Sequence, residues 1–132
     1  GGVIGFFLTL PVLLAGFLKD ETVSGYAMTE AVYVLEETDG TPAPTRTTIS
    51  FPAPGRVVGD GPCNRYGANQ GVPYPWFRID GLTATRTACP ELAFETRYFE
   101  ALQKMTLAEA LGPVLILSND DGNELVFRAA QD

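Results

Sequence analysis

The residues of this chain that could perform chemistry are two cysteines, polar side chains beside them and scattered carboxylates. Cys63 and Cys89 are the only cysteines. A nucleophilic thiol or hydroxyl normally needs a neighbouring base, and histidine is the commonest one. The chain contains no histidine, which argues against nucleophilic catalysis and also removes the commonest metal ligand. We therefore expect no catalytic residue, no cofactor and no metal site.

The paired carboxylates do not suggest an acid–base site either. Glu36 and Glu37 are adjacent, so on a strand their side chains point to opposite faces. Residues 119–124 resemble a calcium loop, but glycine is the fourth residue of this run, whereas an EF-hand loop requires it at the sixth. This run predicts a hairpin turn.

Asn64 and Arg65 follow the first cysteine directly and admit two interpretations. Arginine offers five donors to a carboxylate or phosphate, which would suit a binding site. In the structural interpretation, which we favour, Asn64 satisfies backbone groups of a loop, and Arg65 or Arg86 pairs with a carboxylate.

The composition is that of a packed domain. Apolar residues make up 45% of the chain and charged residues 19%, and the length suits a single hydrophobic core. The net charge is −7, with only nine Lys and Arg residues. Nucleic acid is therefore not an expected partner, because binding it requires a basic surface.

Residues 3–18 form an uncharged apolar run that is too short to span a bilayer comfortably and resembles the core of a secretory signal. We expect export to the periplasm or outer membrane, with membrane association only through this segment. Residues 13–16 look like the run before a lipid-modified cysteine, but Phe17 occupies the cysteine position. Residues 1–25 are thus interpreted as a signal-like segment with a polar tether, and residues 26–132 as the domain. The alternative is that residues 3–18 form a buried helix or strand.

Export bears on the two cysteines. An even number of cysteines in an exported chain predicts a disulfide between Cys63 and Cys89. Closing this loop would stabilise the fold by about 3 to 4 kcal/mol in the chain-entropy model. The alternative is a pair of buried free thiols acting as small apolar residues.

Short segments rich in β-branched and aromatic residues predict several strands. Residues 31–36 precede an Asp-Gly turn, residues 46–51 alternate and stop at Pro52, and residues 56–59 should pair back on them as a hairpin. Further strands are expected at residues 77–80 with 82–85, 106–110, 114–117 and 124–128.

One helix is expected, beginning at Pro90 in the first helical position, with Glu91 and Glu95 at the positive end of its dipole. Its apolar face should contain Leu92, Phe99 and Leu102, with Ala93 and Thr96 between them; Phe94, Tyr98 and Met105 widen this face. Trp76, the only tryptophan, lies in an aromatic and proline cluster and could line a groove, although core packing is favoured.

The predicted fold class is α+β, with about seven to eight short, mostly antiparallel strands packed on one helix. The sheet should be strongly curved or form a partly open barrel. The periodicity does not choose between these.

Two motifs in this order resemble those of the META domain family, also called HslJ-like: Gly61-Pro62-Cys63-Asn64-Arg65-Tyr66 and Thr85-Arg86-Thr87-Ala88-Cys89. The resemblance covers about residues 31–130. It implies a mostly β domain with one helix, often exported or lipid-anchored, linked to bacterial stress and drug resistance, and with no established enzymatic activity. It also implies that Asn64, Arg65, Tyr66, Thr85 and Arg86 are structural motif residues.

The expected function is a monomeric, non-catalytic envelope module that binds an unidentified envelope protein or a lipid. Two alternatives stay open: a lipid-binding or pilotin-like chaperone, and a small enzyme with an unrecognised carboxylate site.

Overall fold

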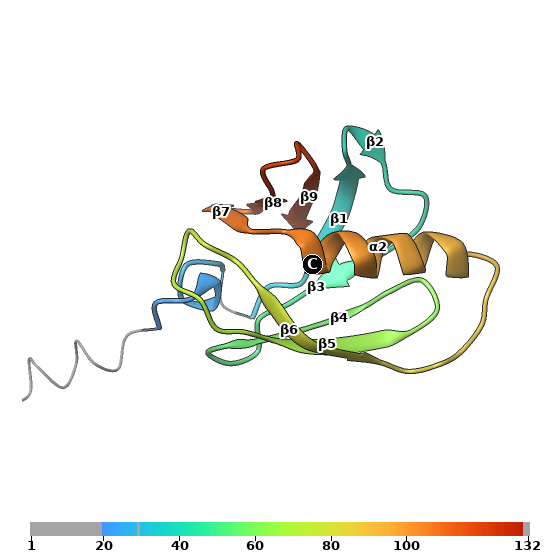
Figure 1. Cartoon of the computed structure of the whole chain (residues 1–132), viewed down its shortest axis with the longest axis horizontal. Helices are drawn as coiled ribbons and strands as arrows, with labels where there is room; N and C mark the ends of the chain where they lie inside the picture. The colour runs from blue at the N-terminus through green and yellow to red at the C-terminus, as the bar shows by residue number, and fades with distance from the viewer. Residues whose placement is uncertain (1–19, 29, 131–132) are drawn as a thin grey trace, which may run out of the picture.

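The computed structural model describes residues 20–28 and 30–130. In these residues, nine strands form two antiparallel sheets and one α-helix lies between them (Figure 1). The expected α+β class is confirmed. The strands are divided between two sheets and do not close into a barrel.

The larger sheet has the strand order β2-β1-β9-β8-β7, and β3 also pairs with β1. Its members are β1 (Tyr33–Thr38), β2 (Thr41–Pro42), β3 (Thr48–Ile49), β7 (Leu107–Leu111), β8 (Val114–Ser118) and β9 (Glu124–Ala129). Buried and outward residues alternate along β8 and β9, which places one face of the sheet on the core. The expected C-terminal strands are confirmed.

The smaller sheet has the order β4-β5-β6, with β4 (Arg56–Asp60), β5 (Arg65–Gln70) and β6 (Ile79–Ala84). Strand β5 was not expected, because Gly, Asn and Gln are poor strand formers. The expected hairpin between residues 46–51 and 56–59 is present only in part, because β3 pairs mainly with β1 and β4 with β5. Only one bridge, between Ser50 and Val58, joins these two segments.

Two of the turns follow from their sequences. Asp39 and Gly40 both have positive φ, 50° and 82°, as a two-residue hairpin turn between β1 and β2 requires. In the run of residues 119–124, the side chain of Asn119 accepts hydrogen bonds from the backbone of Asp121 and Asn123. This run is a hairpin turn between β8 and β9, as expected.

Helix α2 (Leu92–Lys104) confirms the expected helix but presents a different face to the core. Glu95, Tyr98 and Leu102 are buried, whereas Leu92, Ala93 and Thr96 face solvent. The buried residues follow helical i, i+3, i+7 spacing, so they form one stripe. The hydrophobic pattern did not predict that Glu95, a carboxylate, would be part of this buried stripe.

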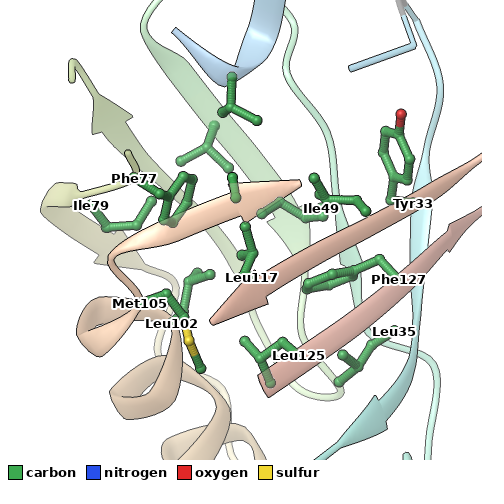
Figure 2. Close-up of a cluster of buried hydrophobic side chains, with 14 of the residues drawn as sticks. Tyr33, Leu35, Ile49, Phe77, Ile79, Leu102, Met105, Leu117, Leu125 and Phe127 are labelled. Carbon is green, nitrogen blue, oxygen red and sulfur yellow. The ribbon is translucent and has the colours of Figure 1, made fainter. Parts of the chain in front are cut away.

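Tyr98 shows how α2 joins the two sheets. Its ring lies 5.8 Å from that of Tyr66 on β5 and 6.5 Å from that of Phe127 on β9, measured between centroids. Leu102 and Met105 extend this contact into a core of aliphatic and aromatic side chains from both sheets (Figure 2). The two sheets and α2 therefore share one core.

The segment before β1 packs onto this core. A short 3-10 helix, η1 (Val23–Gly25), buries Val23 completely, and the Gln70 side chain donates to the hydroxyls of Thr22 and Ser24. Residues 20–25, expected to be a polar tether, thus pack on the fold. The expectation for residues 3–18 lies outside the described residues. Among the described residues, no helix is both long and apolar enough to cross a bilayer.

Trp76 does not fill the core. Its side chain is 59% exposed, and the neighbouring Phe77 is buried instead. The backbone around them pairs with β7, since Phe77 donates to Thr106 and Ala108 donates to Pro75. Because adjacent residues of an extended segment point to opposite faces, this pairing turns Phe77 inward and Trp76 outward.

Candidate functional site

The two family-like motifs meet beside the start of α2. Cys63, in the loop between β4 and β5, forms a disulfide with Cys89, three residues before the helix, with 5.5 Å between their Cα atoms. The predicted pairing is confirmed, and the alternative of two free thiols is wrong. The bridge fixes the loop of residues 61–64 against the N-terminal end of α2.

Glu95 is the centre of this contact. It lies in the first turn of α2 and is only 2% exposed. Its Oε2 accepts hydrogen bonds from the backbone N–H groups of Cys63 (2.8 Å) and Asn64 (2.7 Å), and its Oε1 accepts one from the Asn64 side-chain amide (2.6 Å). Three donors and the positive end of the helix therefore compensate for the burial of this carboxylate.

Asn64 uses all of its side-chain hydrogen-bonding capacity. Besides Glu95, its Nδ2 donates to the Thr87 carbonyl at 2.9 Å. Its Oδ1 accepts from the Thr87 backbone N–H at 2.6 Å and from the Thr85 hydroxyl at 2.9 Å. With four partners the amide has nothing left for a ligand. We name Asn64, Thr85, Thr87 and Glu95, with the Cys63–Cys89 bridge, the loop–helix clamp.

Gly61 makes room for the clamp, and Gly59 makes room for Thr48 and Tyr66 beside it. A Cβ on Gly61 would stand 2.5 Å from Oε2 of Glu95. A Cβ on Gly59 would overlap the Thr48 carbonyl and stand 2.6 Å from the Tyr66 hydroxyl. The spacing Gly59-x-Gly61 is therefore a packing requirement and not a phosphate-binding loop.

Next to the clamp, the buried side chains of Tyr66 and Tyr98 are hydrogen-bonded to each other. The Tyr66 hydroxyl donates to the Thr48 carbonyl at 2.7 Å, so the hydroxyl of Tyr98, 2.6 Å away, donates to Tyr66. Burial raises the pKa of the Tyr66 phenol well above its ordinary value, and the neighbouring Tyr98 raises it further. Burial likewise raises the pKa of Tyr98. Both phenols stay protonated, the opposite of what a nucleophile or base requires.

Of the remaining predicted site residues, Arg65 joins this network through its backbone, whose N–H donates to the Thr85 hydroxyl at 3.1 Å. Arg65 forms an ion pair with Asp60 at 3.4 Å, and both side chains are largely exposed. Arg86 is exposed beside the clamp. Among the described residues, no buried side-chain polar atom lacks a partner, and no group of His, Cys, Asp or Glu could hold a metal ion.

Sequence reasoning placed Glu95 at the helix dipole but missed its function in the clamp. The signal was its position at the i−3 and i−7 spacing from Tyr98 and Leu102, on the face that turns inward. A carboxylate in that stripe needs donors, and the glycine-rich loop around Asn64 supplies them.

Two neighbouring clefts lie along α2, outside the loop–helix clamp. A cleft of about 370 Å³ lies between α2 and the β1–β2 hairpin. A second cleft of about 240 Å³ continues it toward the β8–β9 turn, sharing Thr38, Asp39, Arg97 and Ala101. We call the two together the α2 groove; its wider part is lined by Thr38, Asp39, Thr41, Pro42, Pro44, Phe94, Arg97, Tyr98 and Ala101.

The sequence matches one family model, and the fold is similar to that of several solved structures. The model of the META domain family matches residues 26–132. The fold is similar to that of a protein from Burkholderia xenovorans solved by NMR, with a TM-score of 0.63 and 24% identity over 79% of this chain and 84% of that one. It is also similar to a DUF4847 family protein from Bacteroides vulgatus ATCC 8482, with a TM-score of 0.55 and 19% identity over 65% of this chain and 61% of that one. No curated protein matches the sequence.

The match spans most of the chain and includes every residue of the loop–helix clamp. The chain belongs to the META domain family. At these identities, the solved structures establish the fold alone.

Proposed function

We propose that the chain is a non-catalytic binding module of the bacterial cell envelope and that the α2 groove is its binding site. Export to an oxidising compartment is supported by the disulfide and by the apolar run of residues 3–18. A fold fastened by the loop–helix clamp would hold the groove in one shape in that compartment.

The observation on which this proposal rests is the contrast between the clamp and the groove. The side chains of Asn64 and Glu95 are engaged by partners within the clamp, so neither is available to a substrate. The wider part of the groove has a volume of about 370 Å³, within the range of small-ligand pockets. Its walls combine Pro42, Pro44 and Phe94 with one arginine, Arg97.

Charge suggests the class of ligand. The two oxygens of Asp39 accept hydrogen bonds from the Glu124 backbone and the Asn123 side chain. Arg97 lies 6.0 Å from the centre of the Phe94 ring and has no ion-pair partner among the described residues. Asp39 keeps its negative charge, but both of its oxygens are already engaged, so the uncommitted charged donor in the wider part is Arg97. An apolar segment that ends in a carboxylate, such as the C-terminus of an extended peptide, fits this combination.

The test is an NMR titration of the ¹⁵N-labelled full chain with short apolar peptides that end in a free carboxylate, and with the same peptides amidated. Shifts at Thr38, Arg97 and Ala101 with the free-acid peptides only would support the proposal. R97Q should abolish them, whereas R86Q, which removes an exposed arginine outside the groove, should leave them. Equal shifts with amidated peptides, or none at these residues, would contradict it.

The two alternatives have less support. A small enzyme needs an activated group, yet the tyrosines beside the clamp have raised pKa values and Glu95 is enclosed by its donors. A lipid carrier needs interior space, whereas core side chains occupy the region between the sheets and α2 (Figure 2).

A further inference from the structure

Two aromatic side chains stack where the described chain begins, and a third lies two residues further along the same loop. Tyr26 stacks on Tyr74, with ring centroids 4.2 Å apart and planes 13° from parallel. Trp76 follows Tyr74 by two residues in the same loop. Tyr26 is 45% exposed and Trp76 59% exposed. We call these three residues the aromatic cluster.

The cluster is fastened to the residues that follow the apolar run. The backbone N–H of Tyr74 donates to the carbonyl of Glu21 at 2.7 Å. Glu21 is only three positions after Leu18, the last residue of that run, a distance of about 10 Å in extended chain. If residues 3–18 enter a bilayer, the aromatic cluster must therefore stand close to its surface.

The chemistry of the cluster suits that position. Tyrosine and tryptophan have an apolar body and one polar group, and they are enriched where a membrane meets water. The aromatic cluster is also at the right end of the molecule for a membrane contact. It lies beside η1, near the point where the apolar run joins the domain, and at the end opposite to the start of α2 (Figure 1).

From this geometry we propose that the aromatic cluster rests on the surface of the lipid bilayer that holds residues 3–18. This contact would fix the orientation of the domain relative to the bilayer. It is distinct from the α2 groove and does not depend on the function proposed for it. The net charge of −7, with Asp20 and Glu21 beside the cluster, favours a zwitterionic lipid surface over an anionic one.

The chain provides its own probe, because Trp76 is its only tryptophan. The full chain would be reconstituted into phosphatidylcholine vesicles, unlabelled or brominated near the headgroup end of the acyl chains. We expect Trp76 fluorescence to shift to shorter wavelength, to be quenched by the brominated lipid and to be shielded from acrylamide. Vesicle flotation would show that the chain is bound.

Three results would overturn the proposal. A chain that does not float with the vesicles has no such contact. A Trp76 that acrylamide quenches and brominated lipid does not lies in water. A Trp76 shielded from acrylamide but unaffected by bromine is covered by protein, such as the apolar segment itself.

A pair of variants separates the cluster from general hydrophobic contact. Y26S removes the ring that stacks on Tyr74 and should reduce the quenching by brominated lipid. L92S removes a side chain of similar exposure, 40%, at the opposite end of the molecule, and should leave the quenching unchanged. Equal quenching in Y26S and the unmodified chain would show that Trp76 reaches the lipid without Tyr26, and it would contradict a contact made by the three residues together.

Discussion

Asn64 and Glu95 are joined through both oxygens of one carboxylate, since Asn64 donates its backbone N–H to Oε2 and its side-chain amide to Oε1. The two residues come from different parts of the fold, the loop before β5 and the first turn of α2. Their contact holds the helix on the smaller sheet. Its contribution to the free energy of unfolding can be measured with variants of either partner or of the residues around them.

Replacing Glu95 with glutamine should destabilise the fold by about 1 to 3 kcal/mol, because an NH₂ group then faces a donor in either orientation of the amide. The free energy of unfolding from urea titration would measure this loss. E91Q is the matched control: Glu91 is exposed and its side chain makes no cap hydrogen bond, so the change should stay within about 0.5 kcal/mol. Similar values for the two variants would show that the carboxylate of Glu95 is dispensable.

A second prediction concerns Gly61. In G61A the new methyl group would displace the Glu95 carboxylate from its backbone donors, so we expect a loss of about 1 to 3 kcal/mol. G71A is the control, since a Cβ there meets nothing within 4 Å and should change stability little or raise it slightly. If G61A is as stable as G71A, the glycine is not needed for packing.

These contacts also mark what the sequence could predict. The C-terminal strands, the Asp39-Gly40 turn and the helix follow from local patterns, because alternation, turn residues and helical spacing act over a few neighbours. Strand β5 could not be found in this way: its glycine, asparagine and glutamine are poor strand formers, and pairing with β4 and β6 overrides that preference.

The candidate site shows the same division. The pairing of Cys63 with Cys89 could be predicted because the chain has no other thiol. The place of Glu95 could not, because its donors lie in a loop about thirty residues earlier in the chain. The exposure of Trp76 depends on the pairing of its loop with β7, which is also a tertiary contact.

The disulfide should stabilise the domain by about 3.5 kcal/mol, the chain-entropy value for a sequence separation of 26 residues. Urea unfolding with and without a reductant would measure it, and a C63A/C89A double variant should match the reduced protein. Under non-reducing conditions the intact mass should be two hydrogens below that of the reduced chain. Two thiols that react with an alkylating reagent in the native protein would contradict the bridge.

The direction of the tyrosine hydrogen bonds predicts an order of stabilities. In Y98F one donor is lost and Tyr66 still donates to Thr48, so the cost should be near 1 kcal/mol. In Y66F both the Thr48 carbonyl and the buried Tyr98 hydroxyl lose their partner, which should cost about 1 to 3 kcal/mol. Urea titration at pH 7 compares the two. The reverse order would mean that the hydrogen bonds run the other way.

The same two phenols predict that the domain loses stability in alkali. In the unfolded chain they ionise near their ordinary pKa of about 10, whereas burial raises the pKa of both in the fold. Above pH 10 the unfolded state therefore binds fewer protons than the folded state, and the free energy of unfolding falls as pH rises. Below pH 10 this contribution is fully present. Each phenol can lower stability by up to about 1.4 kcal/mol per pH unit.

Urea titrations at several pH values between 8 and 11 would measure this fall. The Y66F/Y98F double variant, less stable at pH 7, should show a flatter dependence above pH 10 because it has no buried phenol left to titrate. Absorbance at 295 nm gives a second readout: in the native protein the two tyrosines should ionise only as the domain unfolds. An equal slope in the variant would place the alkaline sensitivity elsewhere, and it would mean that the buried pair ionises within the folded state.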